Sequence, residues 1–454
     1  MYFNQWTVVG ETTTNADVTL VPADSIAGLA IKEPVIIMHP GEPPKVAVPP
    51  RPTMRKTQKA YCDAAKLASS LDPKEVLVMA ADLPPELLAA ALWGVNQGLY
   101  QYREYSLKTV GPQVAIKTLQ PLAPHLRQLA AIAVGQSQAR DWVNLPANLK
   151  PPQKLAALMQ ELSSPRIEWE AYDQDRLHDM GAGGILGVGQ GSRRPPVMLV
   201  GRYQGAPGDP WLALVGKGII FDSGGISLKP GEGMGRMKGD MAGAAAVAAA
   251  IRVVAELGLQ VNVLAVLPLA ENLPGGGAYR PGDVLTMLDG TTVEVISTDA
   301  EGRLVLGDGI AWAVNQGVAA VVDIATLTGA NVVALGGIRS ALIGNDPELC
   351  ELVTASAQAM AEPTWELPHD DDYAEFNKTT AADIKNSGGR PAGTITAGLF
   401  VGHFAGSVPW AHLDIAGMAF DASNGVGVGA TGFGVATLVD LSRRFGQRSR
   451  RDAT

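Results

Sequence analysis

Two carboxylates and a guanidinium stand almost next to one another in the segment Ser297–Arg303, which reads Ser-Thr-Asp-Ala-Glu-Gly-Arg. Asp299 and Glu301 follow the apolar run Val293–Ile296 and precede a helical pattern that opens at Leu304. Acids gathered at the end of a strand repel one another, and burying them is costly unless a cation neutralises them. This segment is therefore the first indication of a metal site.

A second group of acids and lysines lies upstream, between residues 215 and 241. Its polar candidates are Lys217, Asp222, Lys229 and Asp240, spaced as Lys-x4-Asp-x6-Lys-x10-Asp. Glycines at 216, 218, 224 and 225 would let the backbone turn tightly and approach a ligand closely. Together with the two downstream acids, the chain offers four carboxylates and two lysines for one site.

These residue types point to hydrolysis assisted by divalent metal ions. The six histidines are scattered along the chain, and no HExxH pair exists. A carboxylate-rich hydrolytic site without histidine suits two divalent ions bridged by shared oxygens, and such ligands select only weakly among zinc, manganese, magnesium and cobalt. A single aspartate after a strand is usually a turn or cap residue. The prediction of a metal site therefore depends on the acids and lysines taken together.

The elements that must position these residues alternate between strands and helices from about residue 165 onward. We expect strands at 197–201, 212–216, 261–267, 293–296 and 319–324, with helices at 243–257 and 303–315. This alternation is typical of a mostly parallel sheet with helices on both faces. Ligands of such sheets bind beyond the carboxyl ends of the strands, and we expect all six polar candidates at one sheet edge.

The length of 454 residues predicts two domains of α/β class. We assign residues 1–122 to a smaller N-terminal α/β domain with an assembly role, in which 75–79 reads as a strand and 85–97 as a helix. Residues 123–143 are predicted to form a linker helix. Residues 144–454 then make the catalytic domain with the parallel sheet. The proline-rich segment 39–52 is expected to be a loop or an extended connector.

Composition argues against several other classes of protein. The net charge of −9 gives no global attraction for nucleic acid or anionic membrane, and the basic cluster at 443–451 is interpreted as a solvated helix end. Two distant cysteines, Cys62 and Cys350, fit a reducing cytosol. Residues 1–5 do not open a secretory signal, and the most hydrophobic stretch, 243–257, is too short to span a bilayer.

On these motifs, the chain resembles the leucyl aminopeptidase family, also called cytosol aminopeptidases. The signature Thr298–Arg303 is highly specific to that family, and the upstream lysine and aspartate series matches its spacing without a gap. The resemblance continues through 144–146, 323–329, 388–396, 410–417 and 430–434, so it covers roughly residues 140–440.

The resemblance implies a role for each candidate residue. One tightly held metal would be bound by Lys217, Asp222, Asp240 and Glu301, and a second, exchangeable one by Asp222, Asp299 and Glu301. Manganese or zinc is expected, with cobalt or magnesium as alternatives. Lys229 would stay charged and face the substrate carbonyl. Arg303 would hold a bicarbonate ion that serves as general base.

The implied reaction is the removal of N-terminal amino acids from peptides by a hydroxide that bridges the two metals. The free amine of the peptide would be held by one metal and Asp240. An apolar pocket of Met237, Thr326, Gly329 and Ala416 would favour leucine-like residues. The family further implies a cytoplasmic homohexamer whose partners are peptides with a free N-terminus, with no membrane involvement.

Alternatives remain open beside this reading. Some family members also bind DNA as architectural factors, although the negative charge here weighs against it. An inactive scaffold would keep the fold without the chemistry, and a phosphate-binding glycine loop would lack a GxxxxGK[ST] match. The chain also departs from the family at Ser297, where asparagine is usual, and at Gly307 and Gly309, which should each cost a helix about 1 kcal/mol.

Overall fold

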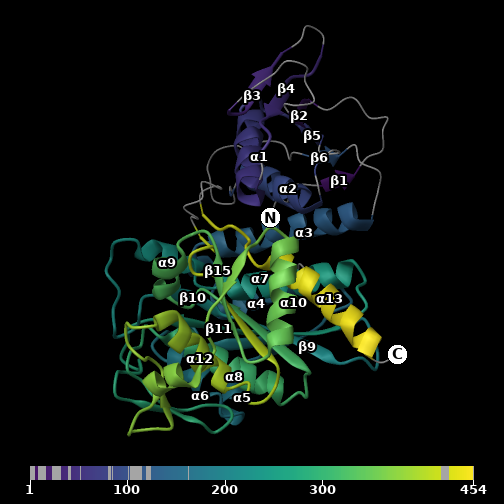
Figure 1. Ribbon diagram of the computed structural model, residues 1–454. Coiled ribbons are helices and arrows are strands. Elements are labelled where there is room, and N and C mark those ends of the chain that lie inside the picture. Colours follow the sequence, from purple (N-terminus) through teal and green to yellow (C-terminus); the bar gives the residue numbers. More distant parts are fainter. Residues whose placement is uncertain are drawn as a thin grey trace.

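A computed structural model of the chain describes residues 6–8, 17–22, 32–38, 42–51, 53–79, 83, 85–100, 102, 115–118, 124–161, 163–420 and 429–452. The prediction for residues 1–5 and part of the one for 39–52 lie outside these ranges. The described part of 39–52 contains the paired strand β4 (Lys45–Val48), so it is extended rather than a loop there. Figure 1 shows a smaller part formed by the residues before α3 and a larger part formed by the rest, here called the N-terminal and C-terminal parts. Within the described residues, no helix is long and apolar enough to cross a membrane.

The N-terminal part is built on a six-stranded sheet in the order β1-β6-β5-β2-β4-β3. Its neighbours pair in parallel except for β3 and β4. Two helices, α1 (Met54–Ser69) and α2 (Pro85–Leu99), pack on each other beside this sheet. The strands are β1 (Trp6–Val8), β2 (Val18–Pro22), β3 (Val35–Ile37), β4 (Lys45–Val48), β5 (Glu75–Val78) and β6 (Ala115–Thr118).

The C-terminal part contains a nine-stranded sheet in the order β16-β15-β18-β14-β9-β11-β8-β7, with β10 paired to β11. Its centre, β18-β14-β9-β11, is parallel, and antiparallel strands flank it. The expected mostly parallel sheet is thereby confirmed. The strands are β7 (Glu168–Tyr172), β8 (Val197–Gln204), β9 (Trp211–Gly216), β10 (Gly218–Asp222), β11 (Asn262–Asn272), β14 (Ala320–Ala325), β15 (Ser340–Gly344), β16 (Thr364–Glu366) and β18 (Trp410–Asp414).

Helices cover both faces of this sheet, which is why its central strands are apolar on both sides. Alternate residues of β9 enter two different cores, Leu212 and Leu214 one, Ala213 and Val215 the other. The first core includes α3 (Pro124–Asn144), α7 (Ala242–Glu256) and α13 (Val435–Asp452); the second includes α6 (Gly183–Gly189), α8 (Glu301–Val314) and α12 (Gly393–His403). Shorter helices are α4 (Pro152–Glu161), α5 (Gln174–Asp179), α9 (Gly329–Leu335), α10 (Pro347–Ala359) and α11 (Asp371–Ala374).

The predicted linker helix exists as α3, which packs on α2 of the N-terminal part and on α7 and α13 of the C-terminal part. A direct bond also joins the two parts, because Trp93 of α2 donates its Nε1–H to the carbonyl of Met360 at 2.6 Å. The division of the chain into domains at 122 and 143 stays a prediction.

One predicted strand belongs to a different sheet. The run 293–296 contributes β13 (Thr292–Glu294), which pairs with β12 (Val284–Thr286) and β17 (Ile384–Lys385) in a separate three-stranded sheet. Only its middle residue, Val293, is buried, so it has the alternating pattern of a half-exposed strand rather than that of a buried parallel strand. The expectation that the strand at 293–296 belongs to the main sheet is therefore wrong, and Asp299 and Glu301 follow a strand of a different sheet.

The two unusual glycines of α8 have a packing role. A Cβ atom at Gly307 would lie 2.7 Å from the Phe404 ring, and one at Gly309 would lie 3.1 Å from Cγ1 of Val215. Both distances are shorter than ordinary contacts, so the glycines let α8 approach α12 and β9 closely. The lower helix propensity of glycine, about 1 kcal/mol per residue, is therefore the cost of this close packing.

Candidate metal centre and active site

Four separate segments bring the polar candidates together. Lys217 follows β9, and Asp222 ends β10. Asp240 follows the short 3-10 helix η3 (Met234–Gly239), and Glu301 opens α8. Lys229 and Asp299 lie on the loops that precede η3 and α8 respectively. The carboxyl ends of parallel strands thus supply two of the six candidates, and helix ends and loops supply the other four.

Each lysine joins two of the acids. The Nζ atom of Lys217 is 2.8 Å from Oδ2 of Asp240 and 2.8 Å from Oε1 of Glu301. The Nζ atom of Lys229 is 2.8 Å from Oδ2 of Asp222 and also pairs with Asp299. All six candidates therefore form one cluster, although they come from distant positions in the sequence.

The charge balance of this cluster leaves room for cations. Each of the four carboxylates shares its ammonium partner with another acid, so the fully ionised cluster carries two more negative than positive charges. Oxygens of Asp222, Asp299 and Glu301 lie within 4.8 Å of one another. The buried Oε2 of Glu301 has no hydrogen-bond partner among the described residues. An oxygen-rich, negatively charged pocket with an unsatisfied carboxylate oxygen fits divalent metal ions.

Burial and mutual repulsion shift the ionisation of these groups. Burial is the main cause that raises the pKa of Glu301 and of Asp240, and the charge on Asp222 adds to it. Burial alone would lower the pKa of Lys217, but Asp240 and Glu301 outweigh it and raise that pKa. Without a metal, Lys217 is therefore an ammonium group. A metal ion bound to Asp240 and Glu301 would neutralise the two acids that raise the pKa of Lys217, and would so favour its neutral amine form.

Asn272, at the end of β11, fixes the geometry of two acidic segments. Its Nδ2 donates to Oδ1 of Asp222 and to the carbonyl of Thr298, both at 2.8 Å. The hydroxyl of Tyr279 donates to the same carbonyl at 2.9 Å. The sequence motifs do not include Asn272; its position at the carboxyl end of a fully buried strand is the one signal that could have identified it.

Glycines provide the close approaches that the cluster needs. Gly224 has a φ of +88° and donates its N–H to Oδ1 of Asp222 at 2.9 Å, a conformation that favours glycine. A Cβ atom at Gly302 would lie 2.7 Å from Nζ of Lys217. Glycine in the signature between Glu301 and Arg303 therefore gives the lysine the space that it occupies.

Arg303 lies beside the cluster without joining its ion pairs. Its Nη1 donates to the carbonyl of Asn386 at 2.5 Å, and its buried Nε has no partner among the described residues. Burial lowers the pKa of Arg303 to about 10, although Glu301 and Asp414 oppose the shift, so the guanidinium stays charged at neutral pH. A buried cation with an unused N–H fits a small anion.

Asn386 and Ser297 organise the signature segment. Oδ1 of Asn386 accepts from the N–H of Ile296 at 2.8 Å, and its Nδ2 donates to the carbonyl of Ser297 at 2.7 Å. The hydroxyl oxygen of Ser297 accepts from the N–H of Asp299 at 3.2 Å. The serine therefore makes a local hydrogen bond to a candidate metal ligand, and Asn386 is a second residue that the motifs missed.

Three of the expected pocket residues lie on segments connected to the cluster. Thr326 donates its hydroxyl to Oδ1 of Asp240 at 2.8 Å, and its carbonyl accepts from Lys217 at 3.0 Å. The N–H of Asp240 donates to the carbonyl of Met237 at 3.2 Å. Ala416 donates its N–H to Oδ1 of Asp414 at 3.1 Å, and the N–H of Leu327 reaches the same oxygen at 3.2 Å.

Gly329, the fourth expected pocket residue, begins α9, and its hydroxyl-bearing neighbour Thr328 caps that helix. The Thr328 hydroxyl also donates to Oδ2 of Asp414 at 2.7 Å. The segments that carry Thr326, Gly329 and Ala416 are thus tied together through Asp414. That the four side chains line one substrate pocket stays a prediction.

A buried lysine connects the loop of Asp240 to the rest of the fold. The Nζ of Lys150 donates to the carbonyls of Trp142, Val143 and Lys238 at 2.8, 2.9 and 2.9 Å. In return, the Nζ of Lys238 donates to the carbonyl of Asn144 at 2.7 Å. The two lysines therefore hold η3 against the end of α3. Sequence reasoning missed Lys150 because lysines are normally exposed.

Comparison with known proteins gives a consistent result. Residues 137–439 match the family described as the cytosol aminopeptidase family, catalytic domain. A probable cytosol aminopeptidase of Syntrophotalea carbinolica is 44% identical over 397 residues, which is 85% of this chain and 80% of that protein. One of Geobacter sulfurreducens is 44% identical over 400 residues, covering 85% and 81%. The solved structure of the bottromycin maturation enzyme BotP in complex with Mn covers 95% of this chain and 100% of its own, with 35% identity and a TM-score of 0.86.

The fold and the carboxylate cluster define a metal-dependent hydrolase of α/β class, and these comparisons define the family. The chain belongs to the cytosol aminopeptidase family. It is accordingly a metallo-exopeptidase that acts on peptide substrates from their N-terminus.

Proposed function

We propose that this aminopeptidase prefers leucine-like N-terminal residues and works with two divalent metal ions. The observation that carries the proposal is the single cluster in which Lys217 and Lys229 each bridge two acids. Four carboxylates with two ammonium groups leave an excess of two negative charges, which divalent cations would neutralise. Manganese is supported by the manganese complex of the structural relative; zinc, cobalt and magnesium are alternatives.

In this proposal, the two metals share ligands. Lys217, Asp222, Asp240 and Glu301 would hold the first ion, and Asp222, Asp299 and Glu301 the second. Asp222 and Glu301 would thus bind both ions. Oxygens of Asp222, Asp299 and Glu301 lie within 4.8 Å of one another, which supports this sharing. When bound, the ions would lower the pKa of water and polarise the scissile carbonyl.

The remaining residues bind and orient the peptide. Asp240 would accept the free α-amine, and the Thr326 hydroxyl, which donates to Asp240 at 2.8 Å, would hold its carboxylate in position. Lys229 would donate to the scissile carbonyl oxygen as negative charge develops there. It is about one quarter exposed, at 23% of its side chain, and can therefore meet a substrate.

We assign Arg303 to hold a bicarbonate ion, which would supply a general base when bound. Its unpartnered, buried Nε supports anion binding at this position. The pocket for the first side chain would combine Met237, Thr326, Gly329 and Ala416. Such an apolar pocket separates side chains that differ by one methylene only modestly, by roughly 10–200-fold.

We further propose a cytoplasmic homohexamer. The names of the curated relatives, cytosol aminopeptidases, support the compartment. Exposed apolar side chains on and beside α9 support self-association, since Val333 is 89% exposed and Val332 and Ile338 are also exposed. Light scattering on the purified protein would give the mass of the assembly directly.

The decisive experiment uses chelator-treated protein and leucine-p-nitroanilide. Addition of manganese, zinc, cobalt or magnesium should restore cleavage, and metal analysis should find two ions per chain. N-acetyl-leucine-p-nitroanilide should not be cleaved, because it offers no free amine. Equal cleavage of the acetylated compound would refute the role given to Asp240. Full activity with one ion per chain would refute the two-metal centre.

No observation favours the DNA-binding alternative. The basic end of the chain forms α13, where Arg443 and Arg444 both pair with Asp440 and Arg448 pairs with Glu348. These contacts satisfy several of the charges that a nucleic-acid arm would need. A shift of duplex DNA that persists at physiological salt would nevertheless establish the second activity.

A further inference from the structure

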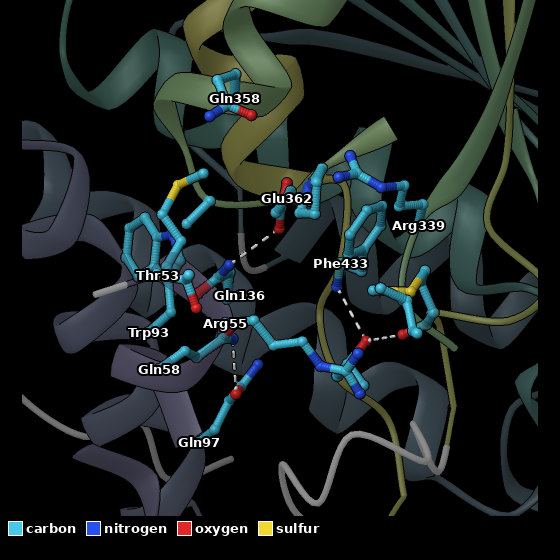
Figure 2. Close-up of a pocket in the computed structure, with 16 residues that line it drawn as sticks. Thr53, Arg55, Gln58, Trp93, Gln97, Gln136, Arg339, Gln358, Glu362 and Phe433 are labelled. Carbon is cyan, nitrogen blue, oxygen red and sulfur yellow. Dashed lines mark hydrogen bonds between the residues drawn. The ribbon is translucent and has the colours of Figure 1, made fainter. Parts of the chain in front are cut away.

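A cavity of about 280 Å³ lies between the N-terminal and C-terminal parts. The first turn of α1, together with α2, forms one side, and α3, the segment after α10 and the segment before α13 form the others. Figure 2 shows Arg55, Gln136, Arg339 and Glu362 around this space. We call it the junction cavity. It includes none of the residues assigned to the metal centre or to the substrate pocket.

The junction cavity contains a buried carboxylate without a counter-ion. Glu362 is 4% exposed, and its donors among the described residues are neutral. They are Gln136 Nε2 at 3.2 Å, the N–H and hydroxyl of Thr437 at 2.9 and 2.7 Å, and the N–H of Gly434. No Lys, Arg or His of the described residues forms an ion pair with it. A buried carboxylate is normally paired, because burial of a lone charge is costly.

The cavity also contains two arginines without a carboxylate partner. Arg55 lies exposed on the first turn of α1. Arg339 donates to the carbonyl of Thr364 at 3.3 Å and lies over the ring of Trp365. Neither forms an ion pair with an acid of the described residues. The junction cavity thus presents charges of both signs that do not neutralise one another.

A further polar atom in the wall lacks a partner. Gln136 is 2% exposed, and its Oε1 makes no hydrogen bond within the described residues, although its Nε2 is used by Glu362. An unsatisfied buried acceptor beside a carboxylate fits a ligand that carries several N–H donors. An ammonium group, with three donors and a positive charge, meets both requirements.

The rest of the lining is apolar. Met54, Trp93, Met418 and Phe433 contribute thioether and aromatic surface to the junction cavity. Such surfaces accept branched or aromatic side chains of varied shape. The size of the cavity is at the lower limit of small-molecule sites, which are typically about 300–1,000 Å³. The occupant must therefore be small.

We propose that the junction cavity binds a free α-amino acid with an apolar side chain. The ammonium group pairs with Glu362 and Gln136 Oε1, the carboxylate meets Arg55 and Arg339, and the side chain contacts the apolar wall. The inference stands on the lining residues and not on the reaction assigned above. If the proposed function also holds, the occupant belongs to the same chemical class as the released product.

Binding here would link the two parts of the chain. Arg55 and Met54 come from α1, Trp93 from α2, and the acid and the second arginine from the C-terminal part. An amino acid that contacts both sides stabilises their contact, since a ligand that binds only the folded arrangement adds its binding free energy to it. Met418, which lines the junction cavity, also lies two residues after Ala416 of the proposed substrate pocket.

Equilibrium dialysis of the manganese-loaded, full-length enzyme against labelled L-leucine tests this proposal. The variants Arg55→Met, Arg339→Met and Gln136→Met should each weaken leucine binding at the junction cavity at least ten-fold and leave leucine binding at the active site as it is. Each should change kcat/KM for leucine-p-nitroanilide less than two-fold. Lys56→Met is the matched control: Lys56 is the neighbouring exposed cation on the same helix turn, it does not line the junction cavity, and the variant should bind leucine as the parent does.

Two analogues test the charges of the ligand. N-acetyl-L-leucine lacks the ammonium group and L-leucinamide lacks the carboxylate, so both should bind the arginine-sensitive sites at least ten-fold more weakly than leucine. The proposal is overturned if none of the three cavity variants changes leucine binding, if Lys56→Met changes it equally, or if N-acetyl-L-leucine binds as tightly as leucine. Loss of peptidase activity in the parent would refute the proposed function alone.

Discussion

The metal centre and the junction cavity both bring charged side chains of opposite sign together, but they arrange the charges differently. At the metal centre, each ammonium is held about 2.8 Å from acid oxygens and the acids are in excess. In the junction cavity, Glu362 and the two arginines line one space without forming ion pairs. The first arrangement calls for added positive charge. The second calls for a ligand that carries both signs.

This difference shows how the same residue types lead to different chemistry. Carboxylates that converge on one point create a strong local field and fit metal ions. Charges that are held apart across a cavity fix the orientation of a dipolar ligand but do not activate water. Fold class alone does not distinguish a metal site from a site for a dipolar ligand. The distinction must come from the local geometry of the charged side chains.

The largest effect is expected from removing an acid or a lysine of the metal centre. Lys229→Met should lower kcat for leucine-p-nitroanilide by about 10²–10³-fold, because a donor aimed at the developing oxyanion is lost. Glu301→Gln should abolish metal-dependent activity and reduce the metal content measured after dialysis. Leucine binding at the junction cavity should be unchanged in both variants. A parallel loss there would show that the two regions are not independent.

A smaller change in the signature should disturb the metal centre through packing alone. Gly302→Ala introduces a Cβ atom 2.7 Å from Nζ of Lys217 and must displace the lysine. Misplacement of about 1 Å can cost about 10²-fold in rate, so kcat/KM should fall to that extent while the circular dichroism spectrum stays the same. Gly276→Ala, where a Cβ atom meets nothing within 4 Å, is the control and should retain activity.

The junction cavity should respond to pH in a defined direction. Burial raises the pKa of Glu362 to about 7, although Thr437, Gly434 and Gln136 donate hydrogen bonds to it. Glu362 is the acidic residue that lines the junction cavity, so its ionisation sets the direction of the effect. Because the folded pKa is above the unfolded value, its contribution to stability is present below about pH 4.5 and is lost as the pH rises through about 7.

Leucine should bind more tightly as Glu362 ionises and gains the ammonium partner. We expect leucine to raise the unfolding temperature more at pH 8 than at pH 5.5, and affinity can change by at most about ten-fold per pH unit for one group. Thermal scans with and without leucine measure this. Glu362→Gln should remove the pH dependence. An equal effect of leucine at both pH values would contradict the pairing with Glu362.

The smallest expected effect concerns the backbone next to Glu362. Ala361 has a φ of +56°, a left-handed conformation that costs a residue with a Cβ atom about 1–2 kcal/mol. Ala361→Gly relieves this strain but increases the entropy of the unfolded chain, so we expect a net gain of roughly 0.5 kcal/mol in denaturant unfolding. Ala355→Gly, in the middle of α10, should instead lose about 0.5–1 kcal/mol. If both variants changed the free energy of unfolding in the same direction, the proposed strain at Ala361 would be refuted.

The sequence alone predicted the parallel sheet and the types of residue that are proposed to bind metal. Buried strands such as 212–216 are continuous apolar runs, and the Lys-x4-Asp-x6-Lys-x10-Asp series with Asp299 and Glu301 is a strong local signal. Both signals are visible in the sequence because a strand buried on both faces is apolar and because carboxylates are common ligands of divalent metal ions.

Tertiary structure decided the rest, because it depends on contacts between distant segments. That β13 joins a separate small sheet, that Asn272 and Asn386 fix the acidic loops, and that Lys150 is fully buried under three carbonyls could not be inferred from local patterns. The junction cavity is the clearest case. Arg55 lies about 300 residues before Glu362, and Phe433 lies about 70 residues after it, and none has an unusual neighbourhood in sequence. Only packing of the two parts against each other brings them around one space.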